Sequence, residues 1–122
     1  MCNDDYEPVL TAFLGAMDRG DFDVALELAA ADATYVRPTL NKPGEPLGSG
    51  SVSYHGKPEI ARFMRERGRR DMRQRVLVSA SAGRHLFAEG LIEFGDGSPD
   101  LRPLFHLAFG EDGRILRFRA VR

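Results

Sequence analysis

One stretch, YHGKPEIARFM at 54–64, constrains the fold most, because it combines a turn, a helix start and an apolar helix face. Its glycine permits a sharp turn, and the proline two residues later suits the first turn of a helix, where no backbone N–H is needed. Ile60, Phe63 and Met64 then recur at spacings of three and four residues and share one face. The pattern predicts a helix at 57–69 that packs against an apolar layer.

Two further helices and a strand are predicted before this stretch. Pro8 suits the first turn of a helix whose apolar residues repeat at helical spacing, and Gly20 ends that helix. Asp21 is a candidate cap for a second, shorter helix. The segment ATYV at 33–36 favours a strand, because Thr, Tyr and Val have high strand propensity, and Pro38 closes it.

The chain beyond the predicted third helix has strand character. Four candidate strands lie at 72–81, 85–94, 101–109 and 115–121. Glycine-containing turns at 95–98 and 110–113 join the last three of them as hairpins. The order of elements predicts one α+β domain over residues 1–122, with helices on one face of a curved, mostly antiparallel sheet.

The segment TLNKPGEPLGSGSVS at 39–53 has a different composition. Two prolines, three glycines and three serines predict a loop for most of its length. A long loop in a compact domain is usually either functional or disordered. A functional loop and a mobile tip without a role therefore both remain open.

Composition and charge argue against several classes of protein. The formal net charge of −1 gives no overall field that would attract nucleic acid or a membrane surface. Arginines cluster at 62–75, but we expect them on the solvated face and end of the helix and at the start of the next strand. Few aromatic residues lie between them to stack on bases. We therefore expect neither nucleic acid nor a membrane as a partner.

Cysteine usage and the N-terminus suggest where the protein works. Cys2 is the only cysteine, which excludes a disulfide framework and argues against a cysteine-based metal site. The acidic N-terminus has no apolar run and predicts no signal peptide. No segment approaches the length of a membrane span. We therefore expect a cytoplasmic protein.

Three segments carry a family resemblance: FLGAMDRGDFDVALELAAADATYVRP at 13–38, HGKPEIARFM at 55–64 and FGEDGRI at 109–115. In this order they resemble the nuclear-transport-factor-2-like superfamily, in particular its SnoaL-like and ketosteroid-isomerase-like branch. The resemblance implies a cone, in which the curved sheet wraps around three helices of the N-terminal half and encloses an apolar cavity. Such proteins include isomerases, polyketide cyclases, epoxide hydrolases, dehydratases and non-catalytic binding domains, so the fold does not fix the activity.

The catalytic positions of ketosteroid isomerases can be compared one by one. By the resemblance, the general base would stand at Arg37, the oxyanion tyrosine at Phe13 and the second aspartate at Phe105. An arginine stays protonated and cannot remove a proton from carbon, and a phenylalanine cannot donate a hydrogen bond to an enolate. We therefore exclude the Tyr/Asp/Asp mechanism.

Tyr35 and Arg37 are the first candidates for catalysis. The resemblance places both in the cavity, and alternate strand residues do share a face. We expect Arg37 to bind an anionic or carbonyl group at the cavity mouth, and Tyr35 to donate a second hydrogen bond. The alternative is that Arg37 lies at the strand end, pairs with a surface acid such as Glu45 and is solvated.

Glu89 and His55 are two further catalytic candidates. If the face of the 85–94 strand that carries Glu89 pointed inward, this carboxylate would be buried, its pKa would be raised and it could act as a general base. The opposite face is more apolar and is the better cavity lining. His55 borders the 39–53 loop and could reach the cavity mouth, although a residue there more often caps or packs. No histidine or acid has convincing metal-ligand spacing.

The resemblance also implies a ligand and a partner. The expected ligand-binding residues are Phe13, Met17, Phe63, Phe105, Leu107, Phe118 and Ala120. We expect a small, cofactor-independent enzyme, a cyclase, isomerase or dehydratase, that acts on a hydrophobic carbonyl-containing small molecule. The alternative is a non-catalytic small-ligand-binding or protein-interaction domain. Related cones often form homodimers through the convex face of the sheet, where Arg117 and Arg119 are expected.

Overall fold

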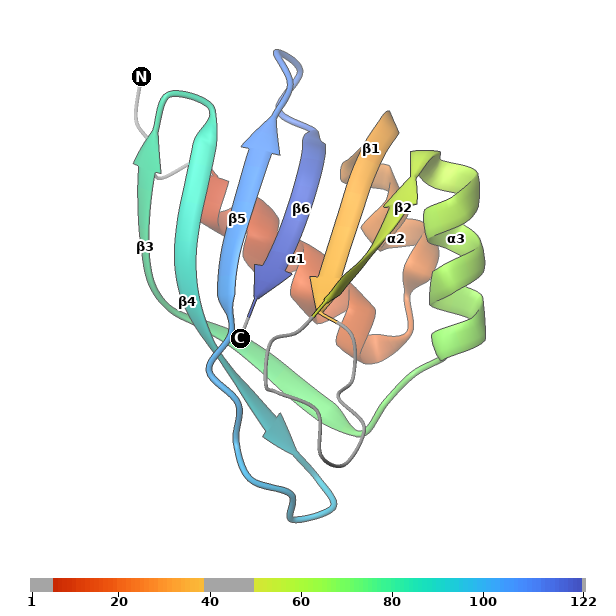
Figure 1. Cartoon of the computed structure of the whole chain (residues 1–122), viewed down its shortest axis with the longest axis vertical. Coiled ribbons are helices and arrows are strands. Elements are labelled where there is room, and N and C mark those ends of the chain that lie inside the picture. The colour runs from red at the N-terminus through yellow and green to blue at the C-terminus, as the bar shows by residue number, and fades with distance from the viewer. Residues whose placement is uncertain (1–5, 39–49, 122) are drawn as a thin grey trace.

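The computed structural model describes residues 6–38 and 50–121, and within them the chain forms three helices and six strands. The helices are α1 (Tyr6–Arg19), α2 (Phe22–Glu27) and α3 (Gly56–Arg67). The strands are β1 (Ala29–Pro38), β2 (Ser51–His55), β3 (Met72–Ala82), β4 (His85–Phe94), β5 (Leu104–Phe109) and β6 (Ile115–Val121). Figure 1 shows one sheet with helices against it, which is the α+β class expected from the sequence.

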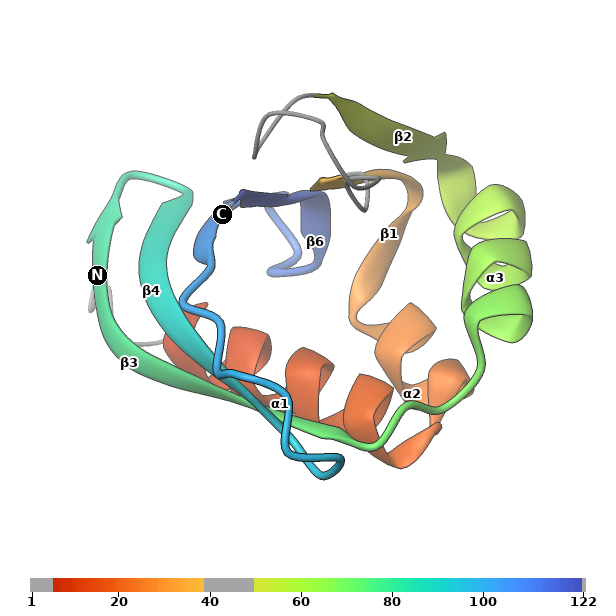
Figure 2. The same ribbon diagram turned by 60° about the horizontal axis from the view of Figure 1, so that its bottom comes forward.

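The strands form a single sheet in the order β2-β1-β6-β5-β4-β3. The one parallel pair among the described strands is β1 with β6, and every other neighbouring pair is antiparallel. The sheet curves around α1, as Figure 2 shows, and α3 lies beside β2 at the other end of the sheet. The curved, mostly antiparallel sheet predicted from the sequence is confirmed.

Local irregularities allow the long hairpin of β3 and β4 to bend. The register between these strands shifts between Val76 and Val78, as in a β-bulge. Gly90 pairs with Val76 just before the shift. A Cβ atom at Gly90 would lie 2.5 Å from Cε2 of Phe105 and 3.0 Å from the carbonyl oxygen of Arg75. Only a glycine lets the backbone and the aromatic ring come this close.

The core lies between α1 and the concave face of the sheet. One face of α1 is buried, because its apolar residues repeat at helical spacing. These residues are Tyr6, Leu10, Phe13, Leu14, Ala16 and Met17. At the start of the helix, the ring of Tyr6 stacks on Phe109 at the end of β5, with centroids 4.1 Å apart and planes 5° apart.

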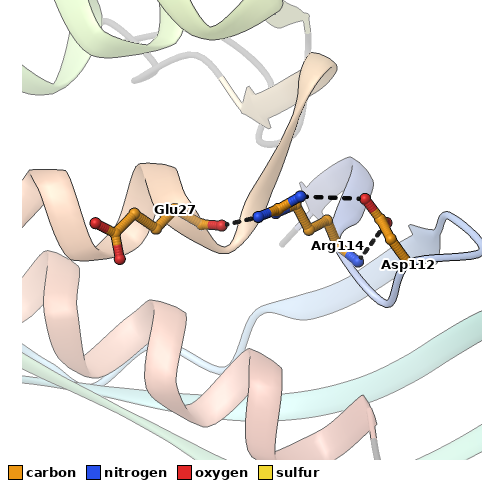
Figure 3. A network of polar contacts seen from close by, with 3 residues as sticks. All are labelled: Glu27, Asp112 and Arg114. Carbon is orange, nitrogen blue, oxygen red and sulfur yellow. Dashed lines mark hydrogen bonds and ion pairs between the residues drawn. The ribbon is translucent and has the colours of Figure 1, made fainter.

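The turn before β6 is tied to the end of α2. The Arg114 side chain donates from Nε to the carbonyl oxygen of Glu27 at 3.2 Å, and its Nη1 lies 3.3 Å from Oδ2 of Asp112 (Figure 3). The backbone N–H of Arg114 also donates to Oδ1 of Asp112 at 3.0 Å. The next N–H, that of Ile115, donates to the carbonyl oxygen of Leu28 at 2.8 Å. These contacts help to set β6 beside β1, the parallel pair that places Tyr35 opposite Phe118.

The observed elements differ from the predicted ones at several boundaries. The helix predicted at 57–69 ends at Arg67, because Gly68 has a φ of +65° and breaks the helical path. The Asp21 side chain makes no capping hydrogen bond; it accepts one from Arg19 instead. The strand predicted at 101–109 begins at Leu104, and Leu101 makes only an isolated bridge to Ile92.

β1 is longer than the predicted strand, and β2 was not predicted. β1 begins at Ala29 rather than at Ala33, because pairing with β6 extends it beyond the residues of high strand propensity. β2 begins in the last three residues of the segment predicted as a loop, and pairing with β1 creates it. The rest of that segment, 39–49, lies outside the described residues. In the part of the chain that is described, no helix is long and apolar enough to cross a membrane.

Candidate functional site

A pocket of about 370 Å³ opens on the concave side of the sheet. Its wall is formed by three residues of α1, the ends of β1 and β2, the C-terminal half of α3, and residues from β3, β4, β5 and β6. It therefore gathers side chains from segments that are far apart in the sequence.

Aromatic rings form much of the pocket wall. Tyr35 stacks on Phe118, with centroids 4.8 Å apart and planes 4° apart. Tyr54 stacks on Phe63 at 4.5 Å, and the Tyr35 ring lies 5.4 Å from the Phe63 ring. Phe13 of α1 closes the group at 5.2 Å from Phe118. This continuous aromatic surface suits a flat, apolar ligand.

Arg37 lies at the end of β1, half-buried in the same wall. Its Nη2 and Nε donate to the Tyr54 hydroxyl oxygen at 3.0 and 3.3 Å, and Nη1 donates to the carbonyl oxygen of Pro38 at 3.3 Å. The guanidinium carbon lies 5.0 Å from the centroid of the Phe63 ring, within the range of a cation–π contact. Among the described residues no carboxylate pairs with Arg37, and Glu45, its alternative partner, lies outside them.

Tyr35 is surrounded by hydrophobic rings and by positive charge. Burial raises the pKa of the Tyr35 hydroxyl, and the charges of Arg67, Arg37 and Arg70, in that order of strength, lower it in part. The balance keeps the pKa above its ordinary value of 10.0. At neutral pH the hydroxyl is therefore protonated and can donate a hydrogen bond.

Arg67 and Arg70 line the pocket, although the sequence analysis placed them on a solvated surface. Arg67, at the C-terminal end of α3, donates to the carbonyl oxygen of Gly68 at 3.1 Å and contacts the Met72 sulfur at 3.8 Å. Burial lowers the pKa of Arg67. Helical spacing could have revealed it, because Arg67 follows Phe63 by four residues on one face. Arg70 follows the helix, and no sequence signal pointed to it.

Glu66 is the only carboxylate among the described residues of the pocket wall. Its side chain is exposed at the edge of the pocket. The sequence analysis did not single it out, because it sits within the charged run at the end of α3. Its position gives the site one group that can accept a proton.

Most of the predicted site residues line this pocket, and a few lie elsewhere. Tyr35 and Arg37 line the pocket. So do Phe13, Met17, Phe63, Phe105, Phe118 and Ala120. Leu107 does not line it, because its side chain is fully buried in the core.

Glu89 and His55 lie away from this pocket. Glu89 alternates with Ala88 and Gly90, which are buried, and so belongs to the outer face of β4. His55, the last residue of β2, is exposed and is not part of the pocket wall. The apolar face of β4 points inward and contributes Ile92 and Phe94 to the wall.

A curved sheet that wraps around a helix and leaves a pocket on its concave side is the architecture of the nuclear-transport-factor-2-like class. The profile of the SnoaL-like domain matches residues 10–118. The chain therefore belongs to the SnoaL-like family. No curated protein sequence matches it.

Several solved structures share this fold. A candidate ketosteroid isomerase from Kribbella flavida matches with a TM-score of 0.71 and 16% identity, over 96% of this chain and 76% of that one. A candidate polyketide cyclase from Sinorhizobium meliloti matches with a TM-score of 0.69 and 15% identity, over 98% and 99% of the chains. A de novo designed protein with a curved β-sheet matches with a TM-score of 0.71 and 15% identity, over 98% and 86%. These similarities establish the shape, and the chemistry has to be argued from the pocket.

Proposed function

We propose that the protein is a small, cofactor-independent enzyme of the SnoaL-like type that acts on a hydrophobic carbonyl-containing small molecule. The reaction is a cyclisation, an isomerisation or a dehydration. The observation that carries this proposal is that the protonated Tyr35 hydroxyl and the Arg37 guanidinium both line one pocket with an aromatic wall. All three reactions pass through an enol or enolate, whose oxygen such a pair would stabilise.

Each step of this chemistry has a candidate residue. The ring system of the substrate packs on Phe118 and its neighbours, and the carbonyl oxygen accepts hydrogen bonds from Tyr35 and Arg37. The Glu66 carboxylate removes a proton from the carbon next to the carbonyl, and the negative charge moves to the oxygen. In an isomerisation the proton returns to a different carbon, and in a dehydration it goes to the hydroxyl group, whose C–O bond breaks as water leaves. In a cyclisation the enolate carbon forms a bond to a second carbonyl carbon of the substrate, and the proton goes to the oxygen of that carbonyl. Of the three catalytic positions of ketosteroid isomerases, where the chain has Phe13, Arg37 and Phe105, this scheme uses only Arg37, and it uses it as a hydrogen-bond donor and not as the base.

The exposure of Glu66 favours a second candidate function. A catalytic base usually lies in a site that excludes water, and the Glu66 side chain is exposed. The alternative is a non-catalytic domain that binds a small hydrophobic ligand in the same pocket or interacts with another protein.

Hydrogen–deuterium exchange separates the two functions. The ketone 2-tetralone is incubated with the protein in D₂O, and NMR follows the loss of its α-protons. An enzyme accelerates this exchange, and Glu66→Gln lowers the acceleration roughly a hundredfold. Arg37→Met lowers it by a similar factor through loss of oxyanion stabilisation. The matched control is Glu59→Gln, an exposed carboxylate in the first turn of the same helix that is not part of the pocket wall.

Two results favour the alternative. One is binding of 2-tetralone, seen as a rise in melting temperature, without any acceleration of exchange. The other is an acceleration that Glu66→Gln and Glu59→Gln leave equally unchanged, because the carboxylate of the pocket would then have no role.

A further inference from the structure

Three arginine side chains converge on this pocket from three separate parts of the chain. Arg37 comes from the end of β1, Arg67 from the last turn of α3, and Arg70 from the segment between α3 and β3. Arg37 and Arg67 are half-buried, and Arg70 is exposed at the rim. Against these three positive charges the described wall offers one carboxylate, Glu66.

The hydrogen bonds of these arginines bring no carboxylate of the described residues against their charges. Arg37 donates to a tyrosine hydroxyl and a backbone carbonyl, and Arg67 donates to a backbone carbonyl and contacts a thioether sulfur. These are neutral acceptors. Within residues 6–38 and 50–121, none of the ion pairs includes Arg37, Arg67 or Arg70.

Asp18, at the end of α1, is a further candidate counter-ion, because its charge raises the pKa of Arg67. Its Oδ2, however, accepts the backbone N–H of Gln74 at 2.7 Å, and its Oδ1 accepts the Gln74 side-chain amide at 3.0 Å. The carboxylate therefore serves to hold β3 against α1, and it neutralises no arginine directly.

The charges of all three arginines act on the Tyr35 hydroxyl. Each of them lowers the pKa of the Tyr35 hydroxyl, and the charges of Arg70 and Arg37 each lower the pKa of Arg67. Like charges gathered without a counter-ion repel one another, and a bound anion relieves that repulsion. Guanidinium groups also match the geometry of carboxylates through paired N–H donors.

We propose that the natural ligand of this pocket is an amphiphilic carboxylic acid: an aromatic or alicyclic ring system that carries a carboxylate. The ring system packs against the rings of Tyr35, Phe63 and Phe118. The carboxylate binds between Arg67 and Arg70, and Arg37 remains available for a carbonyl oxygen. This inference rests on the proposed function only in using the same pocket, and it narrows the substrate class to keto acids.

The anion site can be tested by measuring affinities, without any assay of catalysis, for matched ligands and variants. Isothermal titration calorimetry compares 2-naphthoate with 2-naphthamide, which has the same rings and no charge. We expect wild type to bind the acid at least tenfold more tightly than the amide. Arg67→Gln and Arg70→Gln should each weaken binding of the acid by roughly tenfold and leave the amide unchanged. Arg65→Gln is the control, because Arg65 is exposed on the same helix and is not part of the wall.

Several outcomes would overturn the inference. They are equal affinity for acid and amide, no binding of the acid, and an effect of Arg65→Gln as large as that of Arg67→Gln. If Arg67→Gln loses its fold, Arg70→Gln decides, because its side chain is at the rim and makes none of the hydrogen bonds described. Tight binding of the acid together with no α-proton exchange on 2-tetralone would leave the anion site standing and remove the catalytic proposal.

Discussion

The hydroxyl oxygen of Tyr54 accepts two hydrogen bonds from Arg37, one from Nη2 at 3.0 Å and one from Nε at 3.3 Å. The two residues lie on adjacent antiparallel strands, where Arg37 pairs with Val52 and Tyr35 pairs with Tyr54. The Tyr54 hydroxyl thus fixes the plane of the guanidinium, and with it the donors that remain for a ligand. A strand that begins in the predicted loop and was not expected from the sequence therefore sets the orientation of a predicted site residue.

Replacing Tyr54 with phenylalanine should release Arg37. The ring and its stacking on Phe63 remain, so the fold is kept and the free energy of unfolding falls by only about 1 kcal/mol. The rate of α-proton exchange on 2-tetralone should fall, because the guanidinium that binds the carbonyl oxygen is no longer held in one orientation. Chemical denaturation measures the first effect and NMR in D₂O the second.

Tyr6→Phe is the control for this substitution. Tyr6 is also a tyrosine in an aromatic stack, but it packs on Phe109, and neither residue is part of the pocket wall. A fall in the exchange rate as large for Tyr6→Phe as for Tyr54→Phe would show that the effect comes from general destabilisation.

Substitution of Gly90 by alanine should destabilise the protein by about 1–3 kcal/mol, the usual cost of an overpacked core. The new methyl group would lie 2.5 Å from the Phe105 ring. Replacing Phe105 with the smaller leucine should relieve this clash. In a double-mutant cycle, Gly90→Ala should therefore lower the free energy of unfolding less in a Phe105→Leu background than in wild type. Additive effects in urea denaturation would mean that the two positions do not clash.

High pH should destabilise the protein through Tyr35. Because burial raises its pKa above 10.0, the folded state keeps the hydroxyl proton at a pH where the unfolded state has lost it. Its contribution to stability is therefore complete below pH 10 and is lost as the pH rises through the folded-state pKa. Thermal unfolding should show a steeper loss above pH 10 for wild type than for Tyr35→Phe. Equal slopes would contradict the raised pKa.

The outer face of the sheet exposes a patch of apolar side chains, which we propose as a homodimer interface. Val78, Phe87, Leu104 and Val121 belong to this outer patch and are 60%, 48%, 51% and 38% exposed. Contiguous exposed apolar surface of this kind usually marks an interaction site. Analytical ultracentrifugation should find a dimer for wild type and a monomer for Phe87→Glu.

The control for the dimer is Val24→Glu. Val24 is 45% exposed, lies on α2 and is not part of the outer patch. Dissociation by Val24→Glu, or a wild type that sediments as a monomer at all concentrations, would count against this interface.

The sequence predicted the helices and most of the strands because their patterns are local. The apolar stripe of α3 and the hairpin turns around β5 act over a few residues and need no partner. β2 has no such pattern: Ser51, Ser53 and His55 are exposed, and the strand exists because its backbone pairs with β1. Edge strands that depend on a neighbour in this way are poorly visible in sequence.

Part of the candidate site could also be predicted from the sequence, because its pattern is local. Tyr35 and Arg37 could be placed by alternation along one strand, since both lie within a few residues of each other. Arg67, Arg70 and Glu66 reach the same pocket only because α3 folds back over β1. The run of arginines predicted solvent for Arg67 and Arg70, and no signal pointed to Glu66. The three-dimensional path of the helix end brings all three to the pocket.

β2 runs into α3 without a spacer, since His55 is the last residue of the strand and Gly56, with a φ of +82°, is the first of the helix. Arg37 is hydrogen-bonded to Tyr54 just before this junction, and its guanidinium carbon lies 5.0 Å from the ring centroid of Phe63 on the helix that follows. Arg67 ends that helix four residues after Phe63, about 6 Å further along its axis, so one turn of a rigid helix sets the separation of the two charges. The pocket should therefore select ligands by their length. In a homologous series of acids, affinity should peak at one length instead of rising steadily with apolar surface.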